Sequence, residues 1–288
     1  MSLQVRRPED VNAFLELAGP FLAAREAEHN LLFGICNAIR VTPELFADDP
    51  PRFFVVTDAS ERVVAASLRT PPHNQVLSEM DNPSAADALA EALTEEKLPG
   101  VLGPTQQVKR FAQRWTALTV RSARLAMAER IFRLDRVVPP RRPASGKWRT
   151  AEPQDRRVLA DWLVTFLSEA NPDEAPPPDA LETADRWIAG RHRTVYLWED
   201  EDRATSMVGA GGETPNGIRI GPVYTPPELR ARGYATSLTA AATQDQLDRG
   251  RRFCFLFTDL ANPTSNKIYE AIGYRAVCDV DMYRFGDP

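Results

Sequence analysis

The chain has 288 residues, of which 43% are hydrophobic and 26% charged, a composition typical of globular proteins. Its formal net charge of −5 excludes the broad basic surface that nucleic-acid binding requires. No stretch approaches the ~18 consecutive apolar residues of a membrane span, and the opening residues lack the apolar core of a signal peptide. We therefore expect a cytoplasmic protein that binds neither nucleic acid nor membrane.

The cysteines and histidines give no sign of a metal site or a nucleophilic centre. Cys36, Cys254 and Cys278 are far apart and form no CxxC pair, so we expect reduced thiols and no metal. The three histidines are equally isolated, and we expect structural or surface positions for them: His29, His73 and His192.

The first half alternates helical and extended patterns. An acid-capped helix is predicted over Asp10–Leu17. Two strands joined by a polar turn, Phe53–Thr57 and Arg62–Leu68, precede a third strand at Gln75–Glu79. The glycine pair of Gly100–Gly103 is predicted to form a turn at the end of a strand.

A proline-rich linker, Val138–Lys147, separates the two halves, because its prolines and glycine cannot continue a helix or a central strand. The second half then repeats the pattern of the first. Its first five elements are predicted as two helices, Asp155–Glu169 and Asp179–Gly190, and three strands, Thr194–Trp198, Ala204–Ala210 and Ile218–Val223.

The end of the chain continues this alternation. Small residues fill Thr236–Asp248, and Gly250 stands where the glycine after a helix belongs. The apolar run Phe253–Phe257 is typical of a strand buried on both faces. A last helix begins at Asn262-Pro263, and a last strand covers Arg275–Phe285.

Matching elements of the two halves are offset by about 141 to 143 residues throughout, which indicates a duplicated unit. We therefore predict a mixed α/β (α+β) fold with domains at residues 1–137 and 148–288 and a linker at residues 138–147. Each domain is expected to hold a mixed, mostly antiparallel sheet flanked by helices.

One segment carries recognisable chemistry, the strand-to-helix connection VYTPPELRARGYA at residues 223–235. Gly233 and Ala235 have little or no side chain, so a ligand can approach the backbone closely. The amides of Arg230 to Thr236 would face outward at the start of a helix, where the helix dipole favours an anion. The flanking arginines would add charge-assisted hydrogen bonds, and a pyrophosphate fits this description.

Together with the downstream segment NPTSNKIYEAIGY at residues 262–274, this pattern is similar to the acetyl-coenzyme A signature of the GNAT superfamily of N-acetyltransferases. The form is close to that of glycine N-acyltransferase-like (FR-type) members. The resemblance covers Thr194 to Phe285 well and reaches the first half only through the internal repeat. It implies two tandem GNAT-like domains, acetyl-CoA as co-substrate, no metal, and transfer of an acetyl or other short acyl group to a small primary amine.

The resemblance also implies roles for individual residues. Backbone amides from Arg230 to Ala235 would hold the pyrophosphate, and the strand end at residues 223–225 would pair with the pantetheine arm between two separating strands. Asn262 corresponds to a pantetheine-contacting asparagine, and Tyr269 to the general acid that reprotonates the leaving thiolate. The implied coenzyme-binding residues are Val223, Tyr224, Thr225, Arg230, Ala231, Arg232, Gly233, Tyr234, Ala235, Thr236, Asn262, Ser265 and Asn266.

A general base is not assigned by the sequence. Many GNAT proteins carry a glutamate on the strand before the phosphate loop, whereas this strand, IRIGPV, has no acid. Of the nearby carboxylates, Glu213 is at the far end of the strand, Glu228 is expected to be solvated, and Asp259 is the nearest alternative; water or an acid of the other half could also accept the proton.

The first half lacks the features of a coenzyme site. Its equivalent segment, DNPSAADALAEAL at residues 81–93, contains acids but no glycine or arginine, so it should repel a pyrophosphate. We expect this half to be a structural domain that also closes the acceptor pocket.

Two other functions remain to be distinguished from acyl transfer. One is a non-catalytic acyl-CoA-binding or sensing module, which the missing strand glutamate favours and the presence of Tyr269 opposes. The other is a nucleotide-binding protein, which the absence of both common glycine-rich phosphate motifs disfavours.

Overall fold

The computed structural model describes residues 3–170 and 179–287, except for the side chains of residues 263–265. The first half contains β1 (Gln4–Arg6), α1 (Val11–Ala23), α2 (Asn30–Val41), η1 (Pro43–Phe46), β2 (Arg52–Thr57), β3 (Val63–Arg69), β4 (Gln75–Leu77), α3 (Ser84–Ala92), β5 (Gly100–Pro104), α4 (Thr105–Thr119) and β6 (Ser122–Leu134). The second half contains β7 (Lys147–Thr150), η2 (Pro153–Asp155), α5 (Arg156–Ala170), α6 (Ala180–Ile188), β8 (Arg193–Asp200), β9 (Arg203–Glu213), β10 (Gly217–Tyr224), η3 (Pro227–Leu229), α7 (Tyr234–Asp248), β11 (Phe253–Asp259), α8 (Pro263–Ala271) and β12 (Arg275–Gly286).

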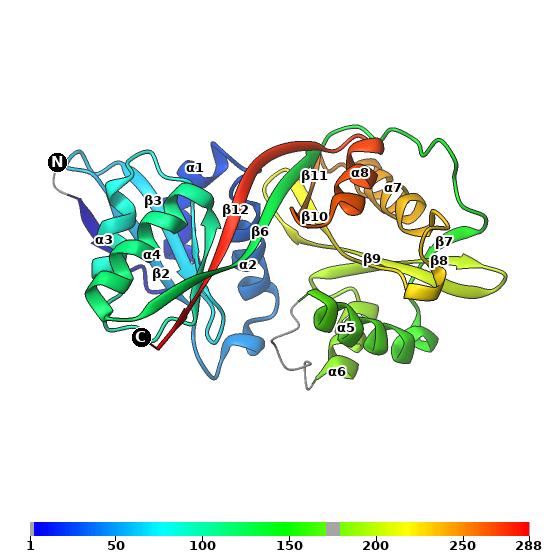
Figure 1. Ribbon diagram of the computed structural model, residues 1–288, viewed down its shortest axis with the longest axis horizontal. Coiled ribbons are helices and arrows are strands. Elements are labelled where there is room, and N and C mark those ends of the chain that lie inside the picture. Colours follow the sequence, from blue (N-terminus) through cyan, green and yellow to red (C-terminus); the bar gives the residue numbers. More distant parts are fainter. Residues whose placement is uncertain (1–2, 171–178, 288) are drawn as a thin grey trace. The chain divides into compact units, whose positions relative to one another are not determined.

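The two halves repeat one order of elements. Apart from the short 3-10 helices, each runs strand, two helices, three strands, helix, strand, helix, strand (Figure 1). The duplication and the mixed α/β fold predicted from the sequence are therefore confirmed.

The compact units of the chain are interleaved rather than consecutive. Unit 1 comprises Met1–Phe132, Phe257–Pro263 and Ala276–Pro288, and unit 2 comprises Arg133–Leu256 and Thr264–Arg275. The predicted boundary at residues 138–147 places the last strand with the second half, whereas nearly all of β12 packs in unit 1. There β12 lies antiparallel to β5, with Val280 opposite Pro104 and Arg284 opposite Gly100.

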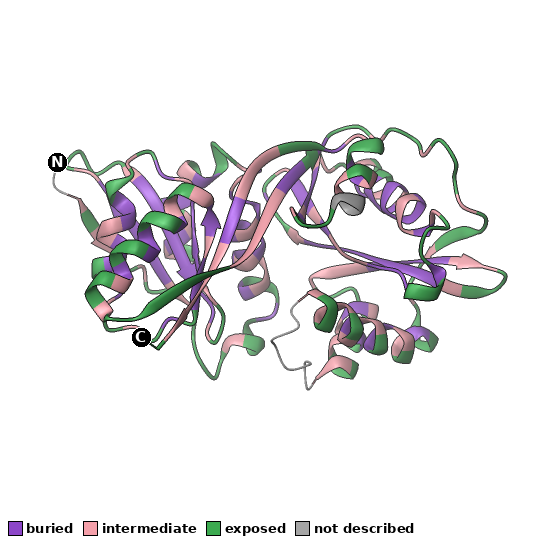
Figure 2. Ribbon diagram, in the orientation of Figure 1, coloured by how far each residue is buried: buried purple, intermediate pink, exposed green. Residues whose placement is uncertain are grey.

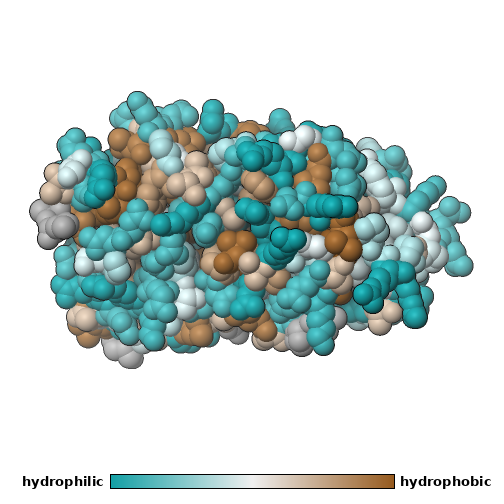
Figure 3. Space-filling model, turned by 90° about the horizontal axis from the view of Figure 1, so that it is seen from above, coloured by the Kyte–Doolittle hydropathy of each residue, from teal (hydrophilic) through white to brown (hydrophobic). Residues whose placement is uncertain are grey.

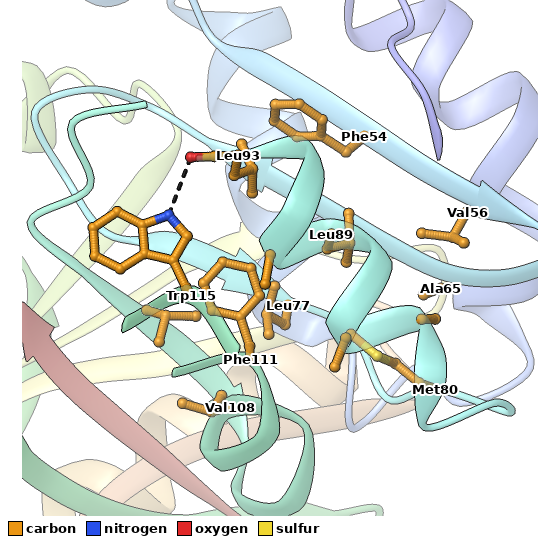
Figure 4. Close-up of a cluster of buried hydrophobic side chains, with 14 of the residues drawn as sticks. Phe54, Val56, Ala65, Leu77, Met80, Leu89, Leu93, Val108, Phe111 and Trp115 are labelled. Carbon is orange, nitrogen blue, oxygen red and sulfur yellow. Dashed lines mark hydrogen bonds between the residues drawn. The ribbon is translucent and has the colours of Figure 1, made fainter. Parts of the chain in front are cut away.

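In unit 1 the strands follow the order β1-β2-β3-β4-β5-β12-β6. Successive residues of β2 enter two different cores, because side chains alternate between the faces of a sheet. Phe53 and Val55 pack with α1 and α2, whereas Phe54 and Val56 pack with α3 and α4. The second core is drawn in Figure 4, where Trp115 donates a hydrogen bond of 3.1 Å from Nε1 to the carbonyl of Leu93. Burial on both faces explains the continuous apolar sequence of this strand.

The predicted turn at Gly100–Gly103 is wrong, because these residues form β5. The glycines are needed for close packing rather than for a turn. A Cβ on Gly100 would lie 2.2 Å from the carbonyl oxygen of Tyr283 on β12, and one on Gly103 would lie 2.8 Å from the carbonyl oxygen of Leu77. The sequence could not show this approach, because β12 lies far along the chain.

In unit 2 the strands follow the order β11-β10-β9-β8-β7. Helices α5 and α6 cover one face of this sheet, and α7 and α8 lie on the other (Figure 1). Leu163, Trp187, Leu197 and Met207 belong to the core beneath α5 and α6. Figure 2 shows the buried residues concentrated along the strands and the inner sides of the helices.

The molecular face in Figure 3 is mainly hydrophilic, with hydrophobic side chains in small separate patches. Such scattered apolar exposure is ordinary for a folded protein. No helix of the described part of the chain combines the length and apolar character needed to cross a bilayer. The same residues contain no cluster of His, Cys, Asp and Glu that could hold a metal ion.

His29 is a structural residue at the junction of α1 and α2. Its ring is 1% exposed, with Nδ1 2.9 Å from the carbonyl of Leu22 and Nε2 3.0 Å from the backbone nitrogen of Glu79. The carbonyl can only accept and the amide can only donate, so Nδ1 carries the proton and the ring is neutral. Burial lowers the His29 pKa, against a weaker raising effect of the Leu22 hydrogen bond.

This environment predicts an acid-sensitive contribution to stability. Because unfolded His29 binds a proton below its ordinary pKa of 6.5 and folded His29 resists it, the free energy of unfolding should fall as pH drops below that value. His29→Ala should cost about 2–4 kcal/mol at pH 7.5, since it strands one donor and one acceptor. It should also weaken the acid dependence, measured by urea unfolding at pH 7.5 and 5.5. The matched control is His73→Ala at an exposed position, which should change neither quantity.

Candidate functional site

The parallel pair β10–β11 separates part-way along its length. Its register joins Gly217, Ile218 and Arg219 to Phe253, Cys254 and Phe255 in turn. β10 continues to Tyr224, and there it remains paired with β9 on its other side. The strands predicted to separate therefore do so, and the far half of β10 has backbone groups facing away from β9.

β10 also contains an irregularity at this point. Its register with β9 shifts between Ile220 and Val223, so the intervening Gly221-Pro222 lies outside the regular ladder. Gly221 has a φ of +141°, a conformation that favours glycine. The Gly221 carbonyl turns toward the side chain of Arg193, which donates a hydrogen bond to it.

The predicted phosphate loop leads from β10 into α7. Ala231 and Gly233 have φ values of +62° and +85°, and the right-handed helix begins at Tyr234. A left-handed residue directly before right-handed ones makes successive amides converge, an arrangement that binds anions. The first helical bond runs from the Ser237 amide to the Gly233 carbonyl at 3.0 Å. The amides before Ser237 thus point away from the helix and are not capped by the side chain of the residue preceding α7.

The two arginines of this loop have protein partners. Arg230 makes an ion pair with Glu169, in which one terminal nitrogen (Nη2) lies 2.8 and 2.7 Å from the two carboxylate oxygens, and its Nε donates to the Thr225 carbonyl at 2.8 Å. Arg232 donates to the Glu228 carbonyl at 3.3 Å. The guanidinium of Arg230 therefore ties the loop to the end of α5. The sequence did not reveal this pairing, because Glu169 is far from the loop along the chain.

Further contacts fix the loop from both sides. Tyr234 donates a hydrogen bond of 2.6 Å to Asp200, and this bond raises the pKa of the phenol. On β9, Ser206 donates to the Tyr224 carbonyl at 2.9 Å and lies 2.9 Å from the hydroxyl of Thr225. These hydrogen bonds fix the end of β10 and the start of α7 on either side of the uncapped amides.

The segment expected to be a simple linker contributes to the same place. The Ala144 amide donates to the Ser237 hydroxyl at 2.9 Å, and the Arg142 carbonyl lies 3.8 Å from where a Gly233 Cβ would be. Residues 138–147 therefore pack beside the start of α7.

Tyr269 lies on α8 with 8% of its surface exposed. Its ring meets that of Tyr274 edge-on at 6.1 Å, and burial raises the pKa of Tyr269 to about 12. Its hydroxyl is therefore protonated at neutral pH. Asn262 directly precedes α8, and its backbone N–H donates a hydrogen bond of 3.0 Å to the Asp259 carbonyl. Asn266 is partly buried on α8, and the side chain of Ser265 lies outside the described residues.

The carboxylates considered as bases have other partners. Glu213 pairs with Arg251, and Glu228 lies 3.9 Å from Arg203. Asp259 accepts a hydrogen bond of 2.8 Å from the Ala261 amide and so shapes the turn before α8. The geometry therefore leaves the base unassigned, as the sequence did.

Sequence reasoning missed Arg193, the first residue of β8. It stands in register with Gly211 of β9, which in turn stands opposite Arg219 of β10, so the two arginines share a face of the sheet on either side of a glycine. A Cβ on Gly209 would lie 2.8 Å from Nη1 of Arg193. The one available signal was the glycine-rich end of β9, GAGGE, whose missing side chains leave room for a long neighbour.

Comparison with known proteins supports the fold and part of the sequence signature. Residues 200–284 match the family model described as FR47-like protein. No curated protein matches the sequence. The family match thus covers the segment that contains the predicted phosphate loop and α8.

Solved structures resemble the whole chain. A Drosophila protein covers 99% of this chain and 98% of its own, with a TM-score of 0.67 and 14% identity. A tandem GNAT protein from the clavulanic acid biosynthesis pathway covers 99% and 98%, with a TM-score of 0.57 and 13% identity. A GNAT-family acetyltransferase from Colwellia psychrerythraea covers 99% and 100%, with a TM-score of 0.53 and 11% identity. At these identities the likeness establishes the fold, which is that of tandem GNAT proteins.

Proposed function

We propose that this chain transfers an acetyl or other short acyl group from coenzyme A to a primary amine. The observation that carries the proposal is the combination of separating strands and an open helix start. β10 leaves β11 after Arg219, and the uncapped amides of α7 follow the end of β10. The tandem GNAT fold and the FR47-like match of residues 200–284 support the same function.

The coenzyme would use two parts of unit 2. Its pyrophosphate would accept hydrogen bonds from the amides around Gly233–Ala235, where the helix dipole also favours negative charge. The peptide-like pantetheine arm would lie along the edge of β10 that faces away from β9, because the pairing of that edge with β11 ends at Arg219. The residues fit the group, because Gly233 carries no side chain, the nearest atoms to its Cβ position are 3.8 Å away, and Thr225 lies 2.9 Å from the Ser206 hydroxyl.

In the reaction, the amine nitrogen would form a bond to the thioester carbonyl carbon while the carbon–sulfur bond breaks. Backbone donors near Val223 would stabilise the negative charge that develops on oxygen. The Tyr269 hydroxyl would give its proton to the departing sulfur, the amine would lose its proton to solvent, and the Tyr269 phenolate would then take a proton back from solvent. The Tyr269 phenol holds its proton at neutral pH, because its ordinary pKa of 10 already lies above that pH and burial raises the pKa to about 12.

Unit 1 is proposed to bind no coenzyme. Helix α3, the equivalent of α7, follows Pro83 rather than a left-handed glycine. The acids of this region are already used in ion pairs, Asp81 with Arg25 at 2.8 Å and Asp87 with Arg110 at 2.6 Å. A pyrophosphate would meet negative side chains here rather than converging amides.

Gly233 provides a test of the pyrophosphate position. Gly233→Asp should weaken acetyl-CoA binding at least tenfold, measured by calorimetric titration, because it places a carboxylate among the phosphate-binding amides. Gly250→Asp is a matched control at the other end of α7, with a φ of +93° and no atom within 4 Å of its Cβ position. Both variants should lose about 1 kcal/mol of stability through backbone strain. Equal coenzyme affinity in the two variants would place the pyrophosphate elsewhere.

Tyr269 separates catalysis from mere binding. Tyr269→Phe should lower kcat about 100-fold and leave the Kd for acetyl-CoA within twofold, because only the proton donor is removed. The control is Tyr274→Phe, which removes the hydroxyl of the neighbouring ring and its 2.8 Å contact with Thr243. That variant should lose stability but keep its turnover. If the wild type binds acetyl-CoA and acetylates no member of a broad amine panel, the chain is an acyl-CoA-binding module instead.

A further inference from the structure

The irregular segment of β10 is held by a side chain from β8, the strand on the far side of β9. The register of β10 with β9 shifts between Ile220 and Val223, so the Gly221 carbonyl leaves the ladder. A Cβ on Gly209 of β9 would lie 2.7 Å from that carbonyl oxygen and 2.8 Å from Nη1 of Arg193. The carbonyl and the guanidinium therefore meet in the space that a side chain of Gly209 would fill.

Arg193 supplies the partner that the displaced carbonyl needs. A backbone carbonyl that leaves a ladder must find another donor, and Arg193 donates a hydrogen bond to Gly221. The guanidinium itself is fixed from above, because it lies 5.3 Å from the ring centre of Trp187 on α6. The direction of the Gly221 carbonyl is thus set by a side chain and not by the sheet.

This direction controls the next backbone donor of β10. Pro222 has no N–H, so the first N–H after the Gly221 carbonyl is that of Val223. Peptide groups are planar, and the ring of Pro222 fixes its φ. Only rotation about ψ of Pro222 then separates the carbonyl held by Arg193 from the Val223 N–H.

The Val223 N–H faces the open edge of β10. On the following residue, the Tyr224 carbonyl accepts a hydrogen bond of 2.9 Å from Ser206 of β9, so the backbone groups of Tyr224 face β9. Backbone groups of consecutive strand residues point to opposite edges. Those of Val223 therefore face the edge whose pairing with β11 ended at Arg219.

The charge of Arg193 is not neutralised by the fold. Arg193 has no ion pair within the described residues, and its buried Nε has no hydrogen-bond partner there. Burial, and to a smaller extent the charge of Arg219, lower the pKa of Arg193 to about 9, and no carboxylate opposes them. The guanidinium is still charged at neutral pH, and a charge in partly buried surroundings acts more strongly on its neighbours than one in water.

The internal repeat shows that this arrangement is particular to unit 2. Arg52 is the first residue of β2, as Arg193 is of β8. Arg52 is neutralised, because it pairs with Glu96 and lies 3.3 Å from Asp49. The copy that is proposed to bind no coenzyme thus uses this arginine in an ion pair, whereas the other copy directs it to the backbone of β10.

We infer that Arg193 is a positioning residue for oxyanion stabilisation: it holds the Gly221 carbonyl so that the Val223 N–H faces the thioester oxygen. This inference rests on the proposed acyl transfer. When the amine nitrogen bonds to the thioester carbon, an electron pair of the carbonyl bond moves onto oxygen, and it returns when the carbon–sulfur bond breaks. A donor already aimed at that oxygen stabilises the charge without reorganisation, and the uncompensated charge of Arg193 favours the same state.

The carbonyl stretching frequency of bound acetyl-CoA tests this role directly. Infrared difference spectra with acetyl-CoA labelled by ¹³C at the thioester carbonyl should show a lower frequency in the wild-type complex than in solution, because a hydrogen bond to the oxygen weakens the double bond. Arg193→Gln should bind acetyl-CoA with a Kd within twofold of wild type and lose most of this lowering. The measurement needs no acceptor.

Turnover provides the second readout. With any accepted amine, Arg193→Gln should lower kcat at least tenfold, because loss of one oxyanion donor costs about 100- to 1,000-fold and a misdirected donor costs part of that. The KM for the amine should stay within twofold. Arg193→Lys keeps a charge and a donor and should recover part of kcat and of the frequency change. The control Arg52→Gln should alter neither.

Gly209→Ala disturbs the same contact without touching Arg193. Its methyl carbon would stand where the Gly221 carbonyl and the Arg193 guanidinium meet, so it should reproduce the loss of kcat and of the lowered frequency. Gly19→Ala is the matched control, since no atom lies within 4 Å of that Cβ position on α1. If Arg193→Gln does not fold, Gly209→Ala and Arg193→Lys decide.

The outcomes separate this inference from the function on which it rests. A wild-type complex whose carbonyl frequency equals that in solution overturns the role of Arg193, as does a folded Arg193→Gln that retains the lowered frequency. A higher KM for the amine with an unchanged frequency would make Arg193 an acceptor contact instead. A chain that does not bind acetyl-CoA overturns the proposed acyl transfer itself.

Discussion

Backbone amides and carbonyls need partners, and the divergence of β10 from β11 leaves a row of them without a neighbouring strand. The divergence begins after Arg219, where the parallel register ends. Three features follow it along the chain in unit 2: the irregularity at Gly221-Pro222, the left-handed Gly233 and the uncapped start of α7. The last two leave backbone amides that no described side chain caps. A peptide-like molecule with a pyrophosphate at one end would satisfy them together.

In the first copy of the repeat, the equivalent pair of strands also separates, but there apolar side chains pack around the space between them. In unit 1, β4 and β5 share only the pairs Gln75–Val101 and Val76–Leu102. The space beyond is a small pocket with an apolar lining, formed mainly by α2, β4 and β5. No left-handed glycine precedes α3. The first copy thus keeps the backbone geometry without the polar groups that a coenzyme would need, and Arg52 there is consumed by Glu96.

Local patterns in the sequence were sufficient to predict the internal repeat, most of the helices and strands, and the loop at residues 230–235. Each of these depends on residues that are close together along the chain, such as the spacing of apolar residues and the placement of glycines. Three features depended on distant residues and could not be predicted. Gly100 is a strand residue because β12 lies against it, and Arg230 is held by Glu169. Arg193 is isolated from acids by the arrangement of three strands and α6, which no single segment of sequence encodes.

The position of β12 has a consequence for how this protein is made. The first unit contains β1 near the start of the chain, yet its sheet gains the strand between β5 and β6 only from Arg275–Gly286. At ~5–20 residues per second, a ribosome needs roughly 8–30 s after completing β6 to deliver that strand. Until then the nascent first unit exposes the unpaired edge of β5, a template for wrong pairing. Because β12 completes the sheet of unit 1, that unit cannot finish folding until nearly all of unit 2 has been synthesised. A stalled or shortened polypeptide would therefore have an incomplete first unit as well as lacking the second.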